Sequence, residues 1–215
     1  MTSTSIKSFY NEDINTDENL PNKQKQVIKA ALELFSTKGF SQTTTTDIAE
    51  KAGVSQGTVY KRFRTKDELL QAVLSPIFQK SLPKAIDEFK NQVESADQSD
   101  LRKLLKYSFQ NRFEFIIANQ QYIKIMFTEA LSNDQLKSEL IQAFSALSLG
   151  ALPKIIEKFK AEKKIVDWPT KRIVQYLIAT GASYAVQPIL LDLPLDPDQA
   201  STDAAEFLYQ ALSVK

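Results

Sequence analysis

The stretch that decides the fold runs from residue 45 to residue 64 and reads TTDIAEKAGVSQGTVYKRFR. Two short helical segments meet in it around Gly53. A helix-turn-helix needs a small residue where its helices cross, a glycine that takes a left-handed turn, and an aliphatic residue that anchors the second helix. Ala49, Gly53 and Val59 meet these needs at spacings of four and six residues. Ser55 is a good N-cap for the second helix, so the stretch predicts a helix-turn-helix.

The exposed face of the second helix carries the groups that DNA recognition requires. Gln56 can form two hydrogen bonds with a base edge, and Gly57 lets the backbone approach a phosphate. The Lys66 ammonium and the free amides at the start of the next helix can bind a phosphate together, and residues 44–46 can contact the DNA backbone in the same way. The predicted DNA-binding residues are Thr44, Thr45, Thr46, Ser55, Gln56, Gly57, Thr58, Tyr60, Lys61 and Lys66. A tight corner between two helices is the alternative interpretation of Ala49, Gly53 and Val59 alone.

Positive charge is concentrated in the same part of the chain. The 215 residues hold 27 Lys and Arg against 26 Asp and Glu, which gives a net charge of +1. Residues 21–66 hold nine of the bases and three of the acids, a net +6, whereas residues 1–20 carry −3 and residues 67–215 carry −2. Such a cationic module is typical of a surface that binds a polyanion. A solvated helical face is the alternative interpretation of the charge.

The chain contains no histidine and no cysteine. Ser-His-Asp and Cys-His catalysis are therefore excluded, together with zinc, haem and iron–sulfur sites that use these ligands. We see no catalytic constellation of carboxylates, Lys or Tyr and no GxxxxGK loop, so we predict neither an enzyme nor a cofactor or metal site. Signal-peptide and membrane-span patterns are also missing, so we expect a cytoplasmic protein without a membrane partner.

From residue 22 onward nearly every segment has the apolar spacing of an amphipathic helix, and we see no alternating strand pattern. We therefore predict an all-α protein of about nine helices. Besides the two short helices, the expected helices cover residues 22–38, 66–91, 100–119, 121–130, 132–164, 168–186 and 197–213. Expected helix caps are Thr65 with Glu68, Ser132 with Gln135, and Asp167. Expected bends are at Pro76, Pro83, Gly150 and Pro153.

The helix-turn-helix segment resembles the N-terminal domain of the tetracycline-repressor (TetR) family, whose signature it matches at Gly53-Val54-Ser55-x-Gly57-Thr58-Val59-Tyr60-x-x-Phe63-x-x-Lys66-x-x-Leu69-Leu70. The resemblance covers about residues 22–70. It implies an all-α homodimer whose N-terminal three-helix domains enter successive major grooves of a palindromic operator. It also implies a larger C-terminal domain that dimerises and often binds a small effector that releases the DNA. We accordingly predict a disordered tail over residues 1–20, a DNA-binding domain over 21–66, and an effector-binding and dimerisation domain over 67–215.

The resemblance implies an effector pocket among the middle helices, and its candidate lining is apolar and aromatic. The candidates are Phe78, Phe109, Phe113, Ile116, Tyr122, Met126, Phe127, Phe144, Leu147 and Tyr176. Aromatic stripes at helical spacing are also typical of a filled core, because a pocket needs voids as well as aromatic residues.

The last two helices are the candidate dimer interface. They combine small residues, which let helices approach closely, with an apolar stripe, and two such helices from each subunit can form a four-helix bundle. The candidate interface residues are Ala179, Ala182, Tyr184, Phe207, Leu208 and Ala211. An ordinary core is the alternative.

The leading hypothesis is a repressor that binds a double-stranded DNA operator as a homodimer and is released by a small hydrophobic or aromatic effector. Effector binding would change the spacing of the two DNA-binding heads through the helix at 66–91. The alternative is a helix-turn-helix dimer without a small effector, acting as an architectural or protein-regulated factor. Activation in place of repression also stays open.

Overall fold

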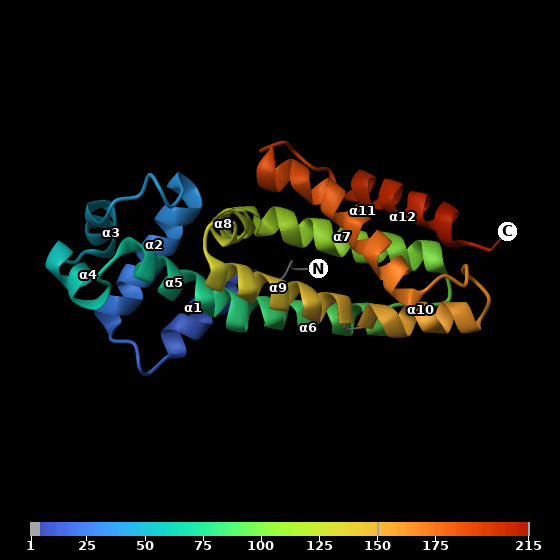
Figure 1. Ribbon diagram of the computed structural model, residues 1–215, viewed down its shortest axis with the longest axis horizontal. Coiled ribbons are helices and arrows are strands. Elements are labelled where there is room, and N and C mark those ends of the chain that lie inside the picture. Colours follow the sequence, from blue (N-terminus) through green and yellow to red (C-terminus); the bar gives the residue numbers. More distant parts are fainter. Residues whose placement is uncertain (1–4, 150, 215) are drawn as a thin grey trace. The chain divides into compact units, whose positions relative to one another are not determined.

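The computed structural model of the chain describes residues 5–149 and 151–214, and it confirms the predicted all-α class (Figure 1). The described part contains twelve α-helices and one π-helical turn, η1, where about nine helices were predicted. Their bounds are α1 Ile6–Thr16, α2 Asn22–Lys38, α3 Thr45–Ala52, α4 Gln56–Arg62, α5 Lys66–Pro76, η1 Ile77–Ser81, α6 Leu82–Ser95, α7 Leu101–Ala118, α8 Gln120–Ala130, α9 Asp134–Leu149, α10 Ala151–Ala161, α11 Thr170–Leu190 and α12 Pro197–Leu212.

The chain folds into two compact units. The N-terminal unit holds residues 5–84 together with residues 121–143, and the C-terminal unit holds residues 85–120 and the described chain from residue 144 onward. The N-terminal unit therefore extends beyond the predicted DNA-binding domain, because it also contains α1, α5, η1, α8 and the start of α9.

The expectation of a disordered tail is wrong for residues 6–16, which form α1. Ile6, Tyr10 and Ile14 recur every four residues, so they share one face of the helix, and all three are buried. This face packs on η1 and α2. Few apolar residues stand in the segment, which is why its composition predicted disorder, but three of them on one face are enough to dock a short helix.

Polar contacts also hold α1 in place. The Asp13 carboxylate pairs with the Lys84 ammonium at 2.6 Å and accepts a hydrogen bond from the Ser81 hydroxyl at 3.2 Å. At the end of α1, the Asn15 carbonyl accepts from the Lys25 ammonium at 2.7 Å. The acidic N-terminal segment thus contacts bases of the same unit.

The helix predicted over residues 66–91 is divided into α5, η1 and α6. Pro76 is the last residue of α5, and the π-helical turn follows it because proline has no N–H for the regular ladder. Pro83 lies in the first turn of α6, where a missing N–H is tolerated, so it causes no second break. The predicted interruption is confirmed at Pro76 alone.

The cap predicted at Ser132 is wrong by one residue. The side chain of Asn133 accepts hydrogen bonds from the N–H groups of Gln135 and Leu136, both at 3.1 Å, and so caps α9. The Ser132 hydroxyl instead donates to the Glu129 carbonyl at the end of α8. Both residue types are good caps, and the connection after α8 decides between them.

The cap predicted at Asp167 is also wrong. α11 begins at Thr170, after Pro169, without a side-chain cap, and Asp167 pairs with Lys160 at 3.1 Å. The bend predicted at Gly150 lies outside the described residues. Pro153 lies in the first turn of α10, where the missing N–H of a proline is tolerated.

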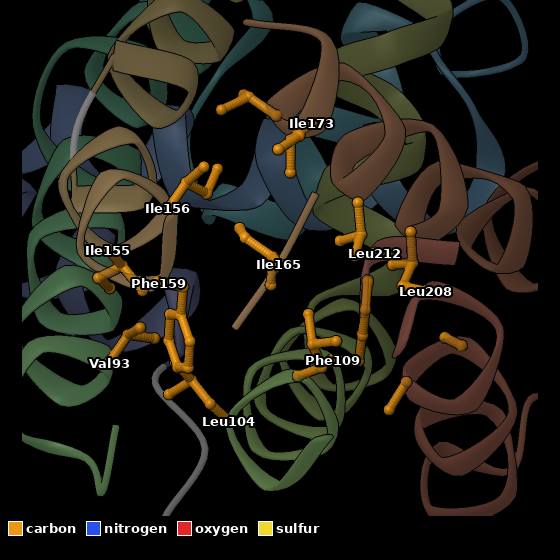
Figure 2. Close-up of a cluster of buried hydrophobic side chains, with 14 of the residues drawn as sticks. Val93, Leu104, Phe109, Ile155, Ile156, Phe159, Ile165, Ile173, Leu208 and Leu212 are labelled. Atoms are coloured by element: carbon orange, nitrogen blue, oxygen red, sulfur yellow. The ribbon is translucent and has the colours of Figure 1, made fainter. Parts of the chain in front are cut away.

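The C-terminal unit is built on one core, which joins α6, α7, α10, α11 and α12 (Figure 2). Figure 2 shows Phe109 from α7, Ile165 from the connection after α10, and Leu208 and Leu212 from α12 pointing into a shared interior. α12 lies along α7. Ile165 also forms an antiparallel bridge with Ser213, which ties the end of α12 to this connection.

α11 is, within the part of the chain that the structure describes, the one helix long and apolar enough to cross a membrane by length and composition. Its residues Ile173, Val174, Pro188 and Ile189 are buried in the C-terminal unit, while its other side chains are exposed or half-buried. A helix that buries one face and offers another to a partner has the same composition.

Candidate nucleic-acid interface

The first helix of the helix-turn-helix, α3, begins in a complete capping box. The Thr44 hydroxyl accepts from the Asp47 N–H at 3.1 Å, and the Asp47 carboxylate accepts from the Thr44 N–H at 3.0 Å. Hydrogen bonds from Thr44, helped by nearby Lys38, lower the pKa of the Asp47 carboxyl below its usual range. The first turn of α3 is therefore firmly held.

The turn between α3 and α4 has the predicted geometry. Gly53 lies in the left-handed region with φ 65°, and the next N–H, of Val54, donates to the Ala49 carbonyl at 3.0 Å. Ser55 caps α4 by accepting from the Thr58 N–H at 3.2 Å. Ala49 and Val59 are buried between the two helices. The predicted helix-turn-helix is confirmed.

α4 presents the predicted reading residues to solvent, except Thr58, which is half-buried and whose hydroxyl is hydrogen-bonded to that of Ser55. Gln56, Gly57, Tyr60 and Lys61 are exposed, and the Tyr60 side chain keeps 49% of its area accessible. Lys61, Arg62 and Arg64 are exposed at the end of α4, and within the described residues they form no ion pair. A cationic end therefore adjoins the polar reading face.

Most of the other bases of this segment have partners inside the unit. Lys51 pairs with Glu33 at 2.6 Å, Lys38 lies 3.9 Å from Asp47, and Lys29 donates to the Asn15 side chain at 2.6 Å. Acidic partners thus offset two of these charges, whereas Lys61, Arg62 and Arg64 form no ion pair in the part of the chain that the structure describes.

Lys66 has a different environment from the one predicted. Its ammonium lies over the Phe40 ring, 4.3 Å from the ring centre, and donates to the Thr43 carbonyl at 3.0 Å. Lys66 therefore ties the start of α5 to the loop between α2 and α3. Thr65 caps α5 as predicted, by accepting from the Glu68 N–H at 3.0 Å. The Glu68 carboxylate accepts from the Arg64 N–H in place of the Thr65 N–H, so the predicted capping box is half formed.

Residues 27–73 match the model of the family described as bacterial regulatory proteins, tetR family. The helix-turn-helix domain of this chain is thus similar to that of the TetR family. It is 39% identical over 98 residues to the HTH-type transcriptional regulator TtgR of Pseudomonas putida, an alignment that covers 44% of each chain. The chain thus matches less than half the length of this curated relative.

Solved structures share the whole fold. A putative TetR-family transcriptional regulator from Mesorhizobium loti superposes with a TM-score of 0.68 at 17% identity, covering 89% of this chain and 97% of that one. The transcriptional regulator FadR of Bacillus subtilis, solved with stearoyl-CoA, gives a TM-score of 0.63 at 19% identity, covering 86% and 96%. These likenesses show the TetR fold.

The predicted effector residues of this chain are divided between the two units. Phe78, Tyr122, Met126 and Phe127 lie in the N-terminal unit, and Phe109, Phe113, Ile116 and Tyr176 lie in the C-terminal unit. The side chains of Phe144 and Leu147 are outside those that the structure describes.

In the C-terminal unit, the predicted effector residues contact one another as a packed core does. The rings of Phe109 and Phe113 stack with centres 5.7 Å apart, and Tyr184 lies 5.4 Å from Phe113. Tyr176 was predicted to line the effector pocket, but it is 44% exposed on α11 and its ring packs edge-to-face with Trp168. The predicted effector pocket remains a prediction.

A cavity of about 300 Å³ lies in the N-terminal unit, among α1, α2, α5, η1 and the end of α4. None of the predicted effector residues lines it. One of its walls is α1, which the sequence did not predict.

The predicted dimer residues fall into two groups. Ala179, Ala182, Phe207 and Ala211 are exposed, and Phe207 keeps 65% of its area accessible. Leu208 was wrongly placed, because it is 1% exposed and belongs to the core of the C-terminal unit. Tyr184 is half-buried against Phe113.

Proposed function

We propose that this protein is a TetR-family transcriptional repressor that acts in the cytoplasm. It binds a palindromic operator as a homodimer and is released by a small hydrophobic effector. The observation that carries the proposal is α4 itself. It exposes Gln56, Gly57 and Tyr60, and Lys61, Arg62 and Arg64, at and just after its end, form no ion pair with any residue that the structure describes.

The size of α4 suits the major groove. An α-helix with its side chains is about 10–12 Å across, and the groove is about 12 Å wide. Gln56 at the start of the helix reads base edges, and the cations at its end bind phosphates, which position the helix.

Gly57 supports the proposed role in DNA binding, because the packing around it leaves room for a larger residue. A Cβ at this position would meet only the Ser55 hydroxyl, at 3.8 Å, an ordinary contact. Glycine weakens a helix, and nothing inside the protein requires it here. Close approach of the helix backbone to DNA is a reason for its presence.

The exposed faces of α11 and α12 are the proposed dimer interface. Tyr176, Ala179, Ala182 and Val186 form an exposed stripe on α11, and Phe207 with Ala211 forms another on α12. Large exposed apolar patches are typical of interfaces, and two helices from each subunit complete a four-helix bundle. A two-fold axis then sets the α4 helices on successive major grooves, roughly 34–36 Å apart.

The proposed effector is an apolar molecule. FadR, which shares the fold, binds stearoyl-CoA, and this chain has apolar, aromatic middle helices suited to a ligand with an acyl chain. We propose an effector with a long apolar part.

Footprinting tests the proposal, with the operator selected from a pool of random duplexes. The expected result is a protected palindrome bound by two chains. The affinity should fall steeply with salt, because the Lys and Arg side chains of the protein release counterions from the DNA phosphates when they bind. An acyl-CoA series of increasing chain length should release the duplex at low concentration. Protection without a palindrome would contradict the dimeric reading, and release by no apolar compound would contradict the effector.

A further inference from the structure

Two side-chain hydrogen bonds join the start of α3 to the reading face of α4. Thr45 Oγ1 lies 2.8 Å from the Tyr60 hydroxyl oxygen. The amide nitrogen of Gln56 donates to Thr46 Oγ1. Thr45 and Thr46 are the first two residues of α3. These two bonds give both hydroxyls a partner within the protein.

The threonines sit on a backbone that cannot shift easily. The capping box of Thr44 and Asp47 closes the first turn of α3 around them. Threonine is also stiff at χ1, because it is branched at Cβ. Their hydroxyls are therefore fixed points from which the longer and more mobile side chains on α4 are held.

The bond to Thr46 determines how Gln56 faces outward. One N–H of its amide is engaged, so its carbonyl oxygen and its second N–H remain available. Adenine offers a matching N6 donor and N7 acceptor in the major groove. An amide held this way loses little rotational freedom on binding.

We propose that Thr45 and Thr46 are positioning residues, which orient Tyr60 and Gln56 for base recognition, where the sequence predicted contacts with the DNA backbone. This inference rests on the proposed function, in which α4 reads DNA. It assigns part of the sequence specificity to two residues outside the reading helix.

The test is Thr46→Val, which removes the hydroxyl but keeps the shape. We expect the ratio of affinities for the selected operator and for its variants at the base pair read by Gln56 to fall about three- to tenfold. Affinity for non-specific duplex and its dependence on salt should stay unchanged. Thr46→Ser keeps the hydroxyl and should restore the ratio, and unfolding curves confirm that each variant folds.

A double-mutant cycle separates positioning from direct contact. If Thr46 acts through Gln56, Thr46→Val has no further effect on the ratio in a Gln56→Ala background. In the same way, Thr45→Val has no further effect in a Tyr60→Phe background. Effects that add, or equal weakening on every duplex with a shallower salt dependence, would show phosphate contacts and overturn the inference.

Failure of the proposed function gives a different result. In that case the wild-type protein selects no duplex from the random pool, so no ratio exists to be changed. A wild-type protein that selects an operator, together with a Thr46→Val protein that keeps the full ratio, overturns the positioning role alone.

Discussion

The Lys66 ammonium donates to the Thr43 carbonyl at 3.0 Å, across the ring of Phe40. The start of α5 is thereby joined to the loop that precedes α3. Lysine at this position thus stabilises the DNA-binding head, in addition to the phosphate contact that its place at a helix start suggests.

Lys66→Ala should therefore have two effects. We expect binding to all duplexes to weaken about equally, because phosphate contacts carry no sequence information. We also expect the free energy of unfolding to fall by about 1 kcal/mol, since a hydrogen bond and a cation–π contact are lost. Denaturant unfolding and binding to specific and random duplexes measure the two effects. A changed base preference with unchanged stability would contradict this account.

Gly57→Ala should change stability and binding in opposite directions. The added methyl group meets no close neighbour, and alanine is the better helix former, so we expect the unfolding free energy to rise by about 0.5–1 kcal/mol. The same methyl group should obstruct the approach of α4 to DNA and weaken operator binding. Thermal unfolding measures the stability of the two proteins, and binding titrations measure their operator affinity. A stabilised variant with full affinity would show that DNA does not approach this residue.

Tyr10 is a buried residue whose hydroxyl has no hydrogen-bond partner in the described part of the chain. Tyr10→Phe should leave α1 docked and raise the unfolding free energy by about 1 kcal/mol, because an unsatisfied buried hydroxyl is removed. A destabilised Phe variant would mean that the hydroxyl is bonded.

The same tyrosine predicts a pH effect. Burial raises the pKa of Tyr10 above its usual value, so the folded protein keeps the phenol proton at a pH where the unfolded chain loses it. This contribution to stability is complete below the ordinary tyrosine pKa of about 10 and declines as the pH rises above it. Between pH 8 and 11, the free energy of unfolding should fall less steeply with pH for Tyr10→Phe than for the wild type.

Phe207→Glu should separate the proposed dimer, because it places a charge in the apolar face of α12. Leu131→Glu is a matched control, since Leu131 is 87% exposed in the N-terminal unit. Sedimentation should show a monomer for the first variant and a dimer for the second. A dimeric Phe207→Glu protein would place the interface elsewhere.

The helix-turn-helix could be predicted because its signals are local. Gly53 at the left-handed turn and the caps at Ser55 and Thr65 act within four residues of where they stand. The cap after α8 could not be assigned between Ser132 and Asn133, because adjacent residues of similar chemistry compete and the packing of the preceding helix decides.

Contacts between distant segments explain what was missed. α1 is stable because Ile6, Tyr10 and Ile14 meet a surface that forms more than sixty residues later in the chain, at η1. Phe207 and Leu208 are neighbours in one apolar stripe, and the docking of α12 on α7 decides which of them is buried. The pairing of Thr45 with Tyr60 depends on the crossing of two helices, which no periodicity shows.

Sequence reading by α4 is tested most directly by measuring how the wild-type and Gln56→Ala proteins bind single-base-pair variants of the selected operator. The account predicts that Gln56→Ala loses discrimination by about 1–3 kcal/mol at one base pair in each half-site and keeps it at the others. Equal discrimination by the two proteins at every position would contradict it.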